Sequence, residues 1–224
     1  MIEIGAYPDQ YCERIAAGPW GEPLNLLSSL AFLLAAALAL RLYRAQPGLR
    51  PGNSPDLLAL IALLTAIGIG SGLWHALATR WAELLDVIPI MLFISLYLLS
   101  TLYRVFRLGV WGTAGVFLAY QALNQGVVLR FPPETLNGSI FYLPTWGCLL
   151  LLALWLRRRH HPLGDTFLAA LGLFTLSLGC RTLDLALCAT IPSGTHFLWH
   201  ALNGLLLYLL LAGLIRAAAA QTRA

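Results

Sequence analysis

The sequence predicts an all-α membrane protein, in which a bundle of seven transmembrane helices forms a single domain over residues 1–224. Hydrophobic residues make up 59% of the chain and charged residues only 11%, whereas a typical soluble domain has about 25% charged residues. The mean hydropathy is +0.75. The 224 residues suffice for about seven spans of about 20 residues with short connections. A separate soluble domain would therefore not fit.

Apolar runs separated by short polar segments give the expected helices. These lie over residues 23–40, 57–78, 84–103, 109–129, 139–156, 166–189 and 196–215. Each run is close to the length that crosses a bilayer.

The arginines indicate how the bundle is oriented. Alternate connections and the C-terminal tail carry most of them: Arg41, Arg44, Arg50, Arg104, Arg107, Arg157, Arg158, Arg159, Arg216 and Arg223. Because such arginines stay in the cytoplasm, we expect the N-terminus outside and the C-terminus inside. A cytoplasmic anchor also explains Arg157 to His161 better than a metal or phosphate site does. The net charge of +4 therefore reflects topology and does not indicate nucleic-acid binding.

The N-terminal segment does not read as a cleaved signal peptide. The first 21 residues contain Glu3, Asp9 and Glu13 and lack the basic start of such a peptide.

Polar side chains within the runs gather at one depth, near the outer helix ends. His196 and His200 are spaced i and i+4, so they share one face of the last helix. Ser71 and His75 have the same spacing near the outer end of the second helix, and Asp86 lies at the outer start of the third. The remaining polar positions at this depth are Glu22, Asn25, Ser29, Arg181 and Asp184.

Three histidines at one depth predict a metal site. A single histidine in a span is more often a hydrogen-bonded packing residue, but His75, His196 and His200 together match a zinc site that keeps its fourth position for water. Imidazole suits zinc, whereas magnesium and calcium prefer oxygen. Asp86 would hold or deprotonate the water or orient a histidine, and Ser71 would donate a hydrogen bond to an oxyanion or to the water. The implied chemistry is hydrolysis of an acyl bond, and the membrane location makes a lipid the expected substrate.

Several motifs carry a resemblance to a known family: Tyr11-Cys-Glu13, Glu22-Pro-Leu-Asn25 with Ser29, Gly70-Ser-Gly-Leu-Trp-His75, Leu84-Leu-Asp86 with Pro89, and His196-Phe-Leu-Trp-His200. In this order they resemble the alkaline ceramidase family over nearly the whole chain. The resemblance implies that His75, His196 and His200 bind zinc, with Asp86 and Ser71 beside the activated water. It also implies cleavage of the ceramide amide to a sphingoid base and a fatty acid.

The short loops and the all-arginine basic set suggest a bacterial relative. Its site would then face the periplasmic side of the inner membrane. Since few bacteria make ceramide, another N-acyl lipid is an alternative substrate.

The resemblance leaves calcium open as a second metal. Eukaryotic relatives hold calcium near the zinc, and Glu13 and Glu22 match two of its ligands. The Tyr11 carbonyl could supply a third and Asp9 a fourth, but Ile15 occupies the position of an asparagine ligand. A calcium site needs six or more oxygens.

The cysteines predict one disulfide. Cys12 and Cys188 both lie on the outer side, where an oxidising compartment permits the bond, and the resemblance points to the same pair. Cys148 and Cys180 lie within spans, where we expect free thiols.

Two other functions stay open. A seven-helix receptor or hemolysin-like protein of the adipoQ-receptor type shares the histidine, serine and aspartate pattern, although the Tyr-Cys-Glu stretch and the outside N-terminus favour the ceramidase branch. Alternatively, the polar groups only lock helices together.

Overall fold

A computed structural model describes residues 10–15, 18 and 20–222, and all regular elements in these residues are helical. The elements are α1 (Pro23–Ser28), α2 (Leu30–Arg44), α3 (Pro55–Leu77), α4 (Arg80–Arg104), α5 (Val110–Arg130), η1 (Ser139–Tyr142), α6 (Leu143–Arg158), α7 (Gly164–Leu183), η2 (Leu185–Leu187) and α8 (His196–Gln221). Only Ser29 separates α1 from α2, so the two form one continuous segment. The all-helical prediction is confirmed.

Six helical segments of the described chain are long and apolar enough to cross a membrane, and they include every long helix except α5. α5 has 21 residues, but Gln121, Asn124 and Gln125 make it more polar than the others. The fold is therefore that of a membrane-spanning helical protein, and the seventh span and the orientation stay predictions.

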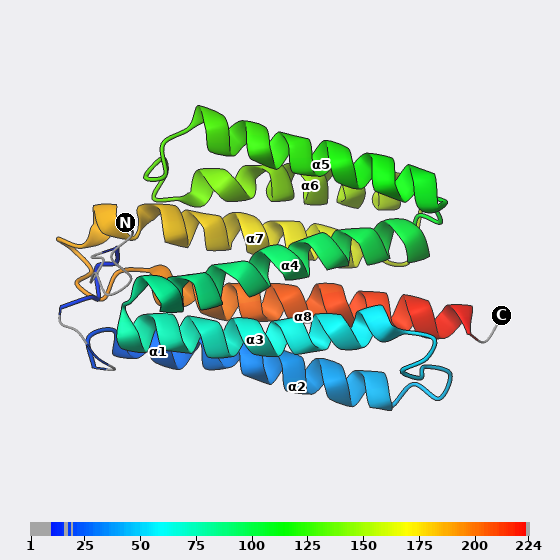
Figure 1. Cartoon of the computed structure of the whole chain (residues 1–224), viewed down its shortest axis with the longest axis horizontal. Coiled ribbons are helices and arrows are strands. Elements are labelled where there is room, and N and C mark those ends of the chain that lie inside the picture. The colour runs from blue at the N-terminus through cyan, green and yellow to red at the C-terminus, as the bar shows by residue number, and fades with distance from the viewer. Residues whose placement is uncertain (1–9, 16–17, 19, 223–224) are drawn as a thin grey trace.

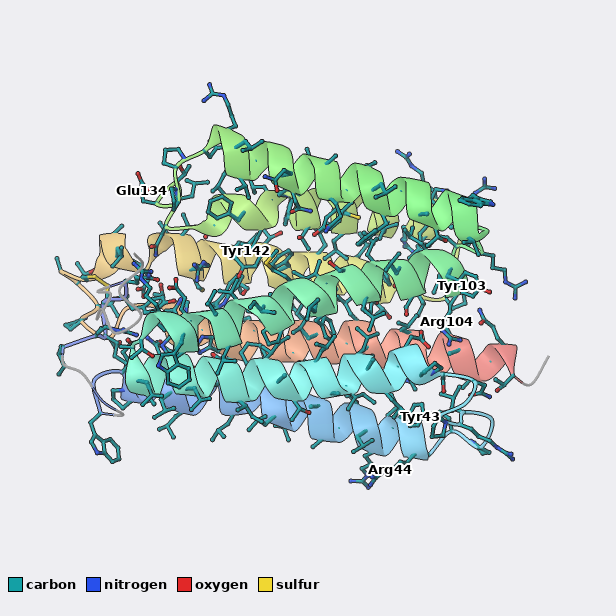
Figure 2. The ribbon with its side chains drawn as sticks, viewed as in Figure 1. Tyr43, Arg44, Tyr103, Arg104, Glu134 and Tyr142 are labelled. Atoms are coloured by element: carbon teal, nitrogen blue, oxygen red, sulfur yellow. A yellow bond between two sulfur atoms is a disulfide. The ribbon has the colours of Figure 1, made fainter. Side chains whose placement is uncertain are left out.

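The long helices run side by side along one axis (Figure 1). The arginine-rich connections gather at the end where α2, α4 and α8 finish, and the labelled Arg44 and Arg104 lie there in Figure 2. At this end Arg104 binds Asp56 with an N–O distance of 2.6 Å, and Ser100 donates to the same carboxylate. The opposite end, where α1 and α8 begin, holds the candidate site.

The core is built around α3 and α8. Leu57, Leu60 and Leu64 of α3 and Leu211 and Ile215 of α8 are fully buried. By contrast, α5 has one buried residue, Thr113, and lies along the edge of the bundle (Figure 1). The polar face of α5 therefore does not pack into the core.

Several predicted boundaries were wrong. The last run continues beyond residue 215 to Gln221, and the third begins at Arg80 rather than at residue 84. The α-helix expected over 166–189 ends at Leu183 and is followed by the short 3-10 helix η2, because the Asp184 carboxylate binds backbone N–H groups of the α8 start and the chain turns away there. The first run does not stop at residue 40 but continues to Arg44.

Candidate metal centre

Three imidazoles meet where the last turn of α3 packs against the first turns of α8. His75, His196 and His200 are each 1–2% exposed. One ring nitrogen of each lies within 4.8 Å of those of the other two. The Nε2 atoms of His75 and His200 are 3.2 Å apart. Helices distant in sequence thus bring together the three predicted ligands.

The start of α8 is held by Asp184, which is completely buried. Its Oδ1 accepts hydrogen bonds from the backbone N–H groups of Thr195 at 2.6 Å and His196 at 2.9 Å. These are first-turn donors that the helix itself leaves unpaired. Gly194 makes this possible, because its φ is +61° and a Cβ there would lie 2.1 Å from Oδ1.

Partners behind two of the histidines fix their tautomers. His75 Nδ1 donates to Glu22 Oε2 at 2.6 Å, and His200 Nδ1 donates to the Asn25 carbonyl at 3.0 Å and to Ser28 Oγ at 2.8 Å. Both Nε2 atoms are therefore left with a lone pair, as metal ligation requires. The third imidazole, His196, has a buried Nδ1 without a hydrogen-bond partner.

This donor set fits zinc. Two nitrogens at about 2.0–2.1 Å from a tetrahedral ion lie about 3.3 Å apart, close to the 3.2 Å between the Nε2 atoms of His75 and His200. Carboxylate and carbonyl acceptors behind the imidazoles are the usual supports of a zinc site. The role of Glu22 in orienting His75 was missed by the sequence reasoning.

Ser71 lies beside the histidines, as expected. Its Oγ is 3.5 Å from His200 Nε2 and 3.0 Å from Ser29 Oγ. Because Ser29 donates to the Asn25 carbonyl, the Ser71 hydroxyl donates to Ser29. Its hydroxyl must turn before it can donate to a reacting group.

Asp86 is placed by a close contact between α3 and α4. A Cβ at Gly70 would lie 2.0 Å from the Leu85 carbonyl oxygen and 3.0 Å from the Asp86 nitrogen, so only glycine lets the backbones approach. This contact sets Asp86 next to the residue that precedes Ser71. The Asp86 side chain is partly buried and has no hydrogen-bond partner in the described residues. It interacts electrostatically with Arg181.

The N-terminal segment covers the imidazoles through Tyr11. Its ring centroid lies 4.1 Å from that of His196, and its hydroxyl accepts a hydrogen bond from Trp74 Nε1 at 3.2 Å. Burial raises the pKa of Tyr11 to about 12, so the phenol keeps its proton at neutral pH. The sequence suggested only its backbone carbonyl.

A disulfide fixes this cover. Cys12 and Cys188 are bonded, as predicted, with their Cα atoms 5.2 Å apart. The Cys12 N–H also donates to Asp184 Oδ2 at 3.1 Å. Cys148 and Cys180 are free, as expected.

The two glutamates considered for calcium have other partners. Both oxygens of Glu13 accept backbone N–H groups at the start of α1, from Leu24 at 2.6 Å and Asn25 at 2.8 Å. Burial raises the pKa of Glu13, while these hydrogen bonds favour its charged form. Glu13 therefore acts as a cap for α1.

Glu22 is surrounded by donors. It accepts from the Arg14 guanidinium, from Asn25 Nδ2 at 2.9 Å and from His75. Burial raises the pKa of Glu22, and Asn25 and Arg14 oppose this by favouring the carboxylate.

The other positions considered for calcium are Tyr11, Ile15 and Asp9. The Tyr11 carbonyl accepts the Arg14 N–H, Ile15 is 85% exposed, and Asp9 lies outside the described residues. With a guanidinium on Glu22 and few oxygens left, the described residues do not fit a calcium ion.

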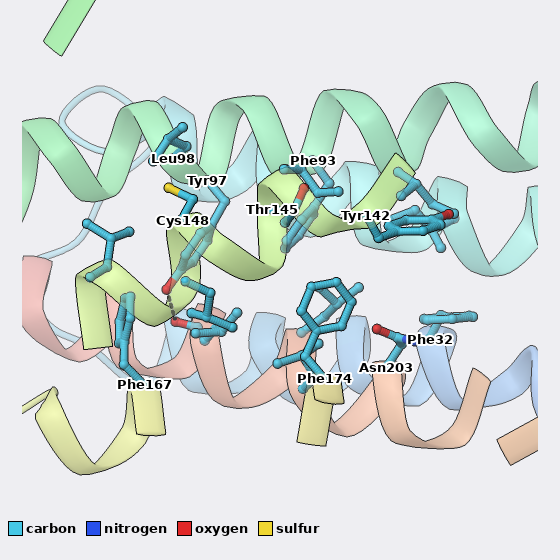
Figure 3. A pocket seen from close by; sticks show the side chains of 18 of the residues that line it. Phe32, Phe93, Tyr97, Leu98, Tyr142, Thr145, Cys148, Phe167, Phe174 and Asn203 are labelled. Atoms are coloured by element: carbon cyan, nitrogen blue, oxygen red, sulfur yellow. Dashed lines mark hydrogen bonds between the residues drawn. The ribbon is translucent and has the colours of Figure 1, made fainter. Parts of the chain in front are cut away.

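Two cavities lie between the helices near the histidines. The first, of about 100 Å³, is almost entirely apolar. It extends along the bundle from Leu98 and Phe167 to Phe32 and Tyr142 (Figure 3). At this last end the Phe32 ring lies 5.8 Å from that of His200.

The second cavity, of about 810 Å³, lies between α4, α5 and the η1 region. Its walls are mostly apolar but hold many more polar groups than those of the first, and we call it the polar cavity. Its polar lining includes Gln121, Asn124, Asn137 and Arg181. Tyr142 and Thr145 line both cavities, so the two meet there.

Comparison with known proteins identifies the family of this chain. A family model described as Ceramidase matches residues 10–223, nearly the whole chain. No curated protein gave a match. Since the family model extends over all the helices that form the site, this chain belongs to the ceramidase family.

Proposed function

We propose that this protein is a zinc-dependent amidohydrolase that cleaves the amide bond of ceramide or a related N-acyl lipid within the membrane. The observation that carries the proposal is the convergence of three buried imidazoles with two Nε2 lone pairs 3.2 Å apart. Membership of the ceramidase family supports the amide as the bond that is cleaved.

His75, His196 and His200 would hold the zinc. When bound there, zinc would supply Lewis acidity that makes hydroxide available from water near neutral pH. The chain contributes the rest. Glu22 and the Asn25 carbonyl keep two imidazoles in the correct tautomer.

Asp86 and Ser71 have the roles of base and hydrogen-bond donor in this proposal. Water adds its oxygen to the amide carbonyl carbon, and Asp86 accepts a proton from that water. Ser71 turns from Ser29 to donate to the carbonyl oxygen as negative charge develops. When the C–N bond breaks, the nitrogen takes the proton from Asp86, which gives a fatty acid and a free amine.

The apolar cavity, of about 100 Å³, suits the part of the acyl chain that lies next to the amide. It begins beside His200 at Phe32 and continues between aromatic and aliphatic side chains (Figure 3). Apolar walls of this kind bind hydrocarbon by excluding water. The amide would then lie at the histidines and the amine portion on the side of the polar cavity.

The test is product analysis with purified protein and a panel of N-acyl lipids. We expect release of fatty acid and amine in equal amounts. Asp86→Asn should keep its zinc and lose turnover, and Ser71→Ala should keep its zinc and lose about a hundred- to a thousandfold in kcat. An active Asp86→Asn enzyme would contradict this mechanism, and a zinc-loaded protein that cleaves no amide would favour the receptor class.

A further inference from the structure

Within the described residues, Arg181 brings a positive charge to the polar cavity without a carboxylate in ion-pair contact. It lines that cavity near the outer end of α7. Its Nε is buried and has no hydrogen-bond partner. In the part of the chain that the structure describes, no carboxylate forms an ion pair with it.

The neighbouring arginines differ in this respect. Arg14 pairs with Glu22, and Arg80 pairs with Glu83 at 2.8 Å. Asp86 interacts with Arg181 electrostatically without forming an ion pair. Arg181 is half-buried, and its nearest polar partners are the Tyr11 hydroxyl and the Asp86 carboxyl group, neither of which forms an ion pair with it. Because a charge that leaves water is costly unless it is closely paired, an anionic ligand in the cavity would stabilise this cation.

The position of Arg181 relates it to the reacting centre. Its guanidinium carbon lies 5.4 Å from the ring centroid of Trp199, the residue before His200, and 5.8 Å from that of Tyr142. These aromatic faces hold the cation in place. Tyr142 lines both cavities, and its ring centroid lies 5.0 Å from that of Trp199. The cation therefore lies beside the metal centre, on the polar side.

The rest of the polar cavity suits a hydrophilic group. Gln121, Asn124 and Gln125 of α5 and Asn137 place amide groups on its wall. These amides can both donate and accept hydrogen bonds. A cavity that held only hydrocarbon would not need them.

We propose that the natural substrate is an N-acyl lipid whose amine portion carries a carboxylate close to the amide, as in an N-acyl amino acid, and that Arg181 binds this carboxylate. The guanidinium fork matches a carboxylate. One cation balances one negative charge, which favours a carboxylate over a phosphomonoester with a charge of about −1.5 to −2. This inference rests on the proposed amide hydrolysis and narrows its substrate class.

The test compares two substrates that differ only at the proposed anion, N-palmitoylserine and N-palmitoylserinol. Both release the same fatty acid, so a preference reports on the amine side. We expect the wild-type protein to favour the serine compound by about ten- to a hundredfold in kcat/KM, the range of a charge-assisted hydrogen bond. Arg181→Gln should abolish this preference through KM with unchanged zinc content, and Arg181→Lys should restore part of it.

Arg130→Gln is the matched control, because it removes the same charge from an exposed position at the end of α5. It should keep the wild-type preference. Equal wild-type rates on both substrates, or an equal loss on both in Arg181→Gln, would overturn the inference.

Equilibrium binding of radiolabelled N-palmitoylserine to Asp86→Asn separates this inference from the proposed function. If Asp86→Asn binds the lipid tightly, the added Arg181→Gln substitution removes this binding and the wild type hydrolyses no lipid, the anion site is supported and the hydrolase function is refuted. Binding that is indifferent to Arg181→Gln would refute the anion site alone.

Discussion

Replacing Gly70 by alanine should inactivate the enzyme without removing its metal. The new Cβ would lie 2.0 Å from the Leu85 carbonyl oxygen and 2.6 Å from its carbon, whereas ordinary contacts begin at 3.4 Å. Both atoms belong to the backbone of α4, so no side chain can rotate away. The helices must separate by about 1.4 Å, the difference between 3.4 and 2.0 Å, and Asp86 moves with α4.

A displacement of about 1 Å at a catalytic group can cost about a hundredfold in rate. We therefore expect Gly70→Ala to lose about a hundredfold in kcat while it binds zinc as the wild type does, because the histidines lie on α3 and α8. Gly72→Ala is the matched control on the same helix, since its Cβ would meet only Leu26 Cδ1 at 3.7 Å. Zinc content and steady-state hydrolysis, measured side by side, decide the matter. Equal rates for the two zinc-loaded variants would refute the reasoning about Asp86.

Three further predictions concern the surroundings of the three histidines. Glu22→Gln weakens the hydrogen bond that orients His75, so zinc affinity should fall about ten- to a hundredfold when it is measured by competition with a chelator. Asp165→Asn is the control, because this side chain is exposed at the opposite end of the bundle, and it should not change zinc affinity. Cys188→Ser opens the bond that links residues 176 apart and releases the Tyr11 cover; its Tm should fall below that of Cys180→Ser, which alters a free cysteine. Millimolar calcium should leave the Tm of the purified protein unchanged, because Arg14 already binds Glu22. A rise in Tm would show a calcium site and contradict this interpretation of Glu22.

Sequence patterns were sufficient for the helices and for the three histidines. The apolar runs determine where helices form, and the i, i+4 spacing of His196 and His200 places both on one face. The distribution of arginines put His75 at the same depth. These features depend on local periodicity and on which end of each helix a residue occupies.

Contacts that depend on helix rotation and crossing could not be predicted. The pairing of Glu22 with His75, the approach of Gly70 to Leu85 and the stacking of Tyr11 on His196 join elements that lie far apart in sequence. The spacing of these residues in the sequence does not indicate which helix faces pack against each other.

The roles of two arginines were missed because they depend on contacts between elements that lie far apart in sequence. Arg14 was given no role from the sequence, but it is buried against Glu22 and makes that carboxylate a poorer calcium ligand. Arg181 was placed at the correct depth, yet its lack of an ion pair became visible only when the neighbouring carboxylates were positioned.

The metal content of the purified protein tests the central claim most directly. Elemental analysis by mass spectrometry should find about one zinc per chain in the wild type and much less in His75→Ala, His196→Ala and His200→Ala. His161→Ala is the control, since its ring accepts a hydrogen bond from the Leu163 N–H in the loop between α6 and α7, outside the three-histidine group. It should bind as much zinc as the wild type. Full zinc occupancy in His200→Ala, or a wild-type protein that binds no zinc when zinc is supplied, would contradict the account.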